Sequence, residues 1–95
     1  MKIFNVGQTA RLRTTFYKDD GTLFPESCTA AIRIQNEALE EVLSSPMQRV
    51  GDEYQFDWQT TEEGRFLLTF SSHDGDFRVQ KQEIILVRRK QMPNY

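Results

Sequence analysis

The chain has 95 residues, of which 27% are charged, and a formal net charge of −2. This length suits one domain with a single modest core, and the composition is that of a soluble globular protein. The nearly balanced charge gives no support to wholesale nucleic-acid binding, so we expect no nucleic-acid partner. No stretch approaches the roughly 20 apolar residues of a membrane span, so we expect no membrane partner. Residues 1–9 lack the apolar stretch of a signal peptide, which predicts synthesis in the cytoplasm without export if Met1 is the true start.

The N-terminal third predicts two half-buried strands joined by a turn and an irregular connection. Residues 2–6 are short and partly apolar, whereas residues 9–17 alternate apolar and polar side chains and carry a basic outer face. Residues 18–21 contain Asp-Gly and predict a tight turn, and residues 22–27 contain Phe-Pro and predict an irregular connection. Residues 28–35 alternate again. The inward positions of the two strands are Ala10, Leu12, Thr14, Phe16, Cys28, Ala30, Ile32 and Ile34.

Residues 37–43 support two interpretations. Their composition favours a helix, and Leu39, Val42 and Leu43 have the i, i+3, i+4 spacing of one helical face. The competing interpretation is a strand over residues 40–44, because the neighbouring segments predict strands and a hairpin return would join them. Both alternatives stay open at this point. A short strand is predicted after them, over residues 47–50.

The clearest pattern in the chain lies in residues 53–72. Three aromatic side chains alternate with polar ones, a turn follows over residues 61–64, and three more large apolar side chains alternate after Gly64. Strand side chains point to opposite faces with a period of two, so we expect a hairpin with all six groups in one core. These residues are Tyr54, Phe56, Trp58, Phe66, Leu68 and Phe70.

Residues 71–76 predict a polar turn, and residues 77–87 predict the last strand. In this strand the period breaks, because four consecutive residues, 84–87, are apolar. If residues 77, 79, 85 and 87 face the core, then Ile84 and Leu86 face outward. They would join Leu67 of the paired strand in one exposed apolar patch, which is typical of an interface. The alternatives are a bulge that shifts the phase of the strand and a patch covered by the tail with Met92.

The domain is expected to span residues 1–88, followed by a basic tail over residues 89–95. This tail starts beside the predicted patch, so we expect the two to form one docking edge along the last strand. The candidate partner-binding residues are Leu67, Ile84, Leu86, Arg88, Arg89, Lys90 and Tyr95.

The chain contains few residues of the types that usually serve in catalysis or metal binding. Cys28 is the only cysteine and is expected to pack as a small buried hydrophobe, which leaves no pair for a disulfide. His73 is the only histidine and is expected to be an exposed turn residue. A zinc site made from a Cys and His cluster is therefore excluded, and the Asp-Gly turns lack the ladder of acidic residues that calcium loops supply. We expect no enzymatic activity, no catalytic residues, no cofactor and no metal.

Six or seven short strands with turns at roughly 10-residue spacing predict an all-β, immunoglobulin-like antiparallel β-sandwich of about seven strands. The runs GQTARLRTTFYKDDGT and YQFDWQTTEEGRFLLTF resemble the immunoglobulin-like modules of bacterial surface proteins and bacteriophage virions. The resemblance covers about residues 7–87 and implies no catalytic residues. Phe66 stands where many such modules have tyrosine, so the hydroxyl bond of a tyrosine corner is not expected there.

The resemblance implies a non-enzymatic structural protein of a bacteriophage virion, such as a decoration, capsid-surface or neck accessory component. Its expected partners are other virion structural proteins or further copies of itself, and its expected location is the virion. The alternative is an immunoglobulin-like adhesion or carbohydrate-binding module of a bacterial surface or secreted protein, located at the cell surface. No exposed aromatic platform supports carbohydrate binding.

Overall fold

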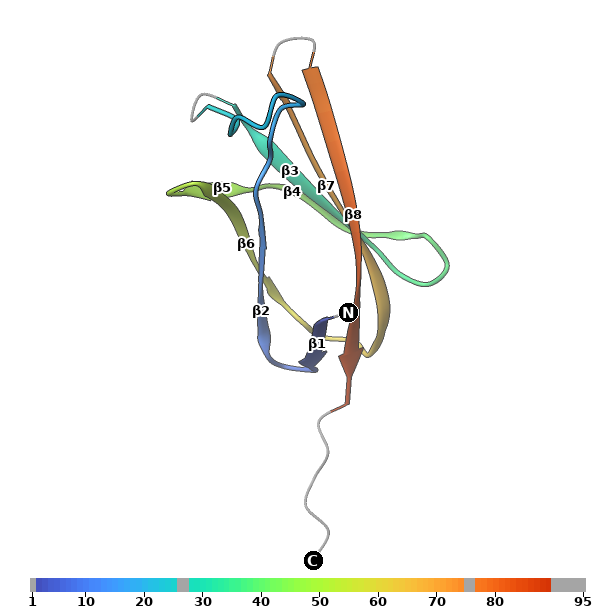
Figure 1. Ribbon diagram of the computed structural model, residues 1–95. Coiled ribbons are helices and arrows are strands. Elements are labelled where there is room, and N and C mark those ends of the chain that lie inside the picture. Colours follow the sequence, from blue (N-terminus) through green and yellow to red (C-terminus); the bar gives the residue numbers. More distant parts are fainter. Residues whose placement is uncertain (1, 26–27, 75–76, 90–95) are drawn as a thin grey trace, which may run out of the picture.

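The computed structural model describes residues 2–25, 28–74 and 77–89, and within them the chain forms strands and turns but no helix (Figure 1). The strands are β1 (Lys2–Asn5), β2 (Thr9–Thr14), β3 (Ala30–Gln35), β4 (Glu41–Pro46), β5 (Gln48–Val50), β6 (Glu53–Gln59), β7 (Gly64–Asp74) and β8 (Phe77–Arg88). They form two sheets packed as a sandwich, so the predicted all-β sandwich is confirmed.

The larger sheet has the strand order β1-β8-β7-β3-β4, and the smaller sheet has the order β2-β6-β5. All pairs are antiparallel except β1 and β8, which are parallel with Lys2 opposite Ile85 and Asn5 opposite Arg88. In the sequence, residues 2–6 showed no clear strand pattern. In the structure, Lys2–Asn5 form β1, an additional strand of the larger sheet.

The core lies between the sheets and is filled by alternate side chains of the strands, as predicted. The indole of Trp58 on β6 meets the ring of Phe66 on β7 edge to face, with centroids 5.0 Å apart. The rings of Phe16 and Tyr54 pack in the same manner at 5.6 Å. Phe56 is only partly buried. The buried apolar residues are Ala10, Leu12, Phe16, Phe24, Cys28, Ala30, Ile32, Ile34, Met47, Tyr54, Trp58, Phe66, Leu68, Phe70, Ile85 and Val87.

The ambiguous segment forms a turn over residues 37–40 and then the start of β4, so the helical alternative for residues 37–43 is wrong. β4 returns antiparallel along β3, with Leu43 opposite Ile34 and Ser45 opposite Ile32. Leu43 packs against the core from this strand. Pairing with β3 thus outweighs a helical propensity that is weak over so few residues.

The β7–β8 hairpin is longer than predicted, and the expected polar turn over residues 71–76 is wrong for its first four residues. Ser71 to Asp74 continue β7 and pair with β8. Ser72 is buried in this extension, and its Oγ donates a hydrogen bond of 2.7 Å to the Thr29 carbonyl. His73 is exposed as expected but lies in the strand. The register runs without a shift from Gly64 opposite Val87 to Asp74 opposite Phe77, so the alternative of a bulge in β8 is also wrong.

Candidate interaction surface

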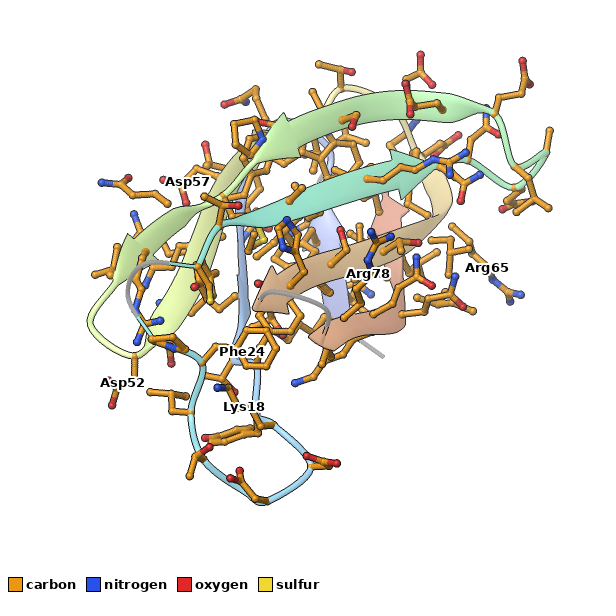
Figure 2. All side chains as sticks on the ribbon, turned by 90° about the horizontal axis from the view of Figure 1, so that it is seen from above. Lys18, Phe24, Asp52, Asp57, Arg65 and Arg78 are labelled. Atoms are coloured by element: carbon orange, nitrogen blue, oxygen red, sulfur yellow. The ribbon has the colours of Figure 1, made fainter. Side chains whose placement is uncertain are left out.

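The solvent-facing sides of the two sheets differ in character. On the smaller sheet, the outward side chains of β2 and β6 are polar or charged, and one apolar side chain, Val50 of β5, is 47% exposed. On the larger sheet, apolar side chains gather where β1, β8 and β7 lie side by side. Figure 2 shows Arg65 extending from the larger sheet on the side opposite Asp52 and Asp57 of the smaller sheet.

We define the apolar patch as Ile3, Leu67, Ile84 and Leu86. Leu67 of β7 lies directly opposite Ile84 of β8, and Ile3 of β1 lies directly opposite Leu86. Ile84 is 52% exposed and Ile3 is 50% exposed, while Leu67 and Leu86 are partly covered. The four side chains stand on the same face of three adjacent strands, which is the arrangement expected of an interaction site.

Three of these residues, Leu67, Ile84 and Leu86, are the predicted ones, and the structure brings them together. Ile3 was missed in the sequence. Its only signal was an apolar residue in a short N-terminal segment, and the parallel pairing of β1 with β8 is what places it on the patch. Because such a pairing joins the two ends of the chain, local periodicity does not reveal it.

Two arginines border the apolar patch. Arg65 of β7 is exposed and lies opposite Leu86. Arg88 of β8 is exposed, and its Nε donates to the side-chain oxygen of Asn5 at 3.3 Å. Arg89 is also exposed and lies 4.0 Å from a carboxylate oxygen of Glu63. The border of the patch is therefore basic.

The remaining predicted residues, Lys90 and Tyr95, fall outside the described part of the chain. Whether any of the seven predicted residues binds a partner stays a prediction.

The predicted docking edge is better described as a face. Over residues 85–87, the backbone of β8 pairs with β7 on one side and with β1 on the other, so no open edge is left there. Farther along, Lys81 Nζ donates to the Thr15 carbonyl and lies 5.5 Å from the centroid of the Phe16 ring. A charged side chain directed inward at an edge opposes the addition of another strand. Binding at β8 would therefore use its side chains rather than its backbone.

A shallow hollow of about 1010 Å³ lies at the other end of the larger sheet. Its outward-facing lining includes the small side chains of Ala31 and Ser71, with His73 and Arg78 on the β7–β8 hairpin. Its lining residues include no phenylalanine, tyrosine or tryptophan on which a sugar ring could stack. The hollow is open, and its lining mixes apolar and polar side chains.

The outer face of the smaller sheet carries a paired charge. Arg11 of β2 lies opposite Asp57 of β6, and its Nε and Nη2 donate to the two carboxylate oxygens at 2.9 and 3.3 Å. The hydrogen bond from Arg11 holds the pKa of the Asp57 carboxyl below its ordinary value, and the Arg11 pKa is raised in return. The charges of Arg11 and Asp57 therefore compensate each other.

Replacing Asp57 by Asn is expected to lower the free energy of unfolding at neutral pH but not in acid. Because the folded pKa of Asp57 lies below its unfolded value, its contribution to the stability is present above about pH 4 and is lost as the pH falls through the folded pKa. The urea midpoints of wild type and Asp57→Asn should therefore converge on acidification. Arg11→Gln removes the same pair and should converge likewise. A difference in urea midpoint that stays the same at all pH values would show that the Arg11–Asp57 ion pair does not cause it.

Within residues 2–25, 28–74 and 77–89, no three His, Cys, Asp or Glu side chains lie close enough to share a metal ion. Those same ranges contain no helix of the length and apolarity needed to cross a membrane. Comparison of the chain with protein-family models, curated proteins and solved structures gave no match. The surface of the molecule is therefore the basis for a functional proposal.

Proposed function

We propose that the protein is a non-enzymatic, immunoglobulin-like docking module that binds another protein through the apolar patch. The observation that carries this proposal is the pairing of the half-exposed Ile84 and Ile3 with Leu67 and Leu86 on one face. Covering such side chains releases free energy in proportion to the apolar area removed from water, about 25 cal/mol per Å². The basic border would steer an acidic partner to the patch more than it would raise the affinity.

The most specific form of the proposal is an accessory component of a bacteriophage virion, such as a decoration, capsid-surface or neck protein. Its support is the resemblance of residues 7–87 to virion and bacterial surface modules. The second candidate is an adhesion module of a bacterial surface protein. The lining of the hollow on the larger sheet includes no phenylalanine, tyrosine or tryptophan, which makes protein docking a better fit than carbohydrate binding.

We expect the double variant Ile84→Ser and Leu86→Ser to be lost from the particle of the phage that encodes the protein. Serine removes the apolar surface of two outward side chains, so the fold should survive while docking fails. The measurement is the amount of tagged protein that sediments with purified particles. Val50→Ser is the matched control, because Val50 is comparably exposed but lies on the other sheet.

Retention of the double variant at the wild-type level would contradict docking through the patch. Unfolding of the double variant, seen as a loss of the cooperative urea transition, would mean that these side chains belong to the core. Recovery of the wild-type protein in the cell envelope fraction, and not in particles, would favour the surface-module candidate.

A further inference from the structure

Leu39 combines two unfavourable features. It is the one non-glycine residue with positive φ in the described chain, at 61°, and its side chain is 63% exposed, the most exposed large apolar side chain described. An L-residue in this left-handed region is strained, and glycine or asparagine usually occupies it. Leucine gains nothing here from burial in its own domain. Outliers of this kind cluster at binding sites.

The turn that carries Leu39 is fixed by its own hydrogen bonds. The side-chain oxygen of Asn36 accepts from the amides of Ala38 and Glu40, both at 3.0 Å. The Leu39 amide donates to the Asn36 carbonyl at 2.9 Å, and the Leu39 carbonyl accepts from Gln35 Nε2 at 3.0 Å. The backbone that carries the leucine is therefore held in one conformation before any partner arrives, which lowers the cost of ordering the turn on binding.

This turn lies beside the apolar patch. Gln35, which holds the Leu39 carbonyl, is opposite Leu67 of the patch in the β3–β7 register. Glu37 of the turn accepts a hydrogen bond of 3.1 Å from the amide of Arg65, the arginine at the border of the patch. Figure 1 shows the β3–β4 turn projecting well away from the sheet.

The turn and the patch have opposite charges around their apolar residues. Leu39 stands among Glu37, Glu40 and Glu41, and of these Glu41 is paired with Arg33 at 3.4 Å. The patch is bordered by Arg65 and Arg88. One molecule thus carries an acidic apolar projection and a basic apolar surface next to each other.

We propose that the occupant of the apolar patch is a second copy of this chain, with Leu39 of each copy packed on the patch of the other. Because the turn and the patch are adjacent on one face, a two-fold axis lets each copy give and receive the same contact, as in isologous dimers. The inference rests on the proposed docking role of the patch and names its partner.

The first test is the oligomeric state of the full chain, measured by sedimentation equilibrium up to about 1 mM protein, where even a millimolar dissociation constant gives a measurable dimer. Wild type should show a monomer–dimer equilibrium. Leu39→Asn should weaken it at least tenfold while raising the melting temperature, because asparagine relieves the backbone strain. Val50→Asn, an apolar-to-polar change on the other sheet, should leave the dissociation constant unchanged.

The second test exchanges the charges. Glu40→Lys and Arg65→Glu should each weaken self-association, and an equimolar mixture of the two variants should associate more tightly than either alone. A wild-type chain that stays monomeric, or a Leu39→Asn variant that dimerises normally, would overturn the inference. So would a charge mixture that shows no recovery.

Failure of this inference can be told apart from failure of the docking proposal. If the wild-type chain is monomeric but the Ile84→Ser and Leu86→Ser variant is still lost from particles, the patch binds a different protein and only the second-copy inference falls.

Discussion

Replacement of Trp58 by alanine is expected to lower the free energy of unfolding by about 3–5 kcal/mol, the usual range for a large core aromatic. Trp58 is 8% exposed and spans the space between the sheets, since it lies on β6 and its ring meets Phe66 of β7 edge to face at 5.0 Å. Alanine would leave a cavity bounded by both sheets, which neither sheet can fill without shifting its pairing.

Urea unfolding at neutral pH measures this loss. Gln59→Ala is the control for an outward-facing change on the same strand: it loses only the exposed hydrogen bonds of the Gln59 side chain with Thr9 and the Gly7 carbonyl, so it should cost about 1 kcal/mol, well below the cost of Trp58→Ala. In the wild type, Trp58 fluorescence should be shifted to shorter wavelength relative to free tryptophan. An emission spectrum like that of tryptophan in water would contradict the buried position.

The position of Trp58 illustrates what the sequence can reveal about this fold. Alternation along residues 53–72 predicted which side chains enter the core, because the pleat of a strand sends successive side chains to opposite faces. The same rule placed Ile84 and Leu86 outward, since the register of β8 has no shift. Where one face is buried, a slip of one residue would expose the whole core row, so the pattern strongly constrains the register.

Features set by long-range pairing were not predictable in this way. The strand β1 forms because the C-terminal part of β8 offers a free edge, and nothing within residues 2–6 indicates that partner. β4 forms because β3 lies beside it, against a local preference for helix. Ser71 to Asp74 are polar, yet they extend β7 because β8 continues opposite them.

The candidate site was therefore only partly predictable. Its three central residues follow from alternation and hairpin pairing, whereas Ile3 depends on the β1–β8 contact. Leu39 was visible in the sequence only as a member of the ambiguous segment. Its significance comes from a backbone angle and an exposed side chain, and neither is encoded in a local pattern.

Replacement of Arg49 by methionine is expected to cost about 3 kcal/mol, because hydrogen bonds to charged groups contribute more than neutral ones and their loss leaves acceptors unpaired. Arg49 is on β5, yet its side chain is only 15% exposed. Its Nη1 donates to the Phe24 carbonyl at 2.9 Å and to Tyr54 Oη at 3.3 Å, and its Nε donates to the Gly51 carbonyl at 2.9 Å. The guanidinium carbon also lies 5.3 Å from the centre of the Tyr54 ring.

The tyrosine continues this network. Tyr54 Oη donates a buried hydrogen bond of 2.9 Å to the Cys28 carbonyl, so one chain of bonds links β5 and β6 to the connection that precedes β3. In the described part of this connection, Leu23 forms an isolated bridge with Tyr17, the Phe24 amide donates to the Phe16 carbonyl, and the Phe24 side chain is almost fully buried. The Arg49–Tyr54 network therefore fixes the irregular segment on the end of the sandwich.

Tyr54→Phe should cost about 1–3 kcal/mol, because the Cys28 carbonyl loses its donor in a buried place. The double variant Arg49→Met and Tyr54→Phe should cost less than the sum of the two single changes, since each already breaks the shared chain of bonds. Arg13→Met is the control, because Arg13 is an exposed arginine on β2 and its loss should be nearly neutral. The free energies come from urea unfolding of all four proteins and wild type. Strictly additive losses, or an Arg49→Met variant as stable as Arg13→Met, would show that the network does not hold the connection in place.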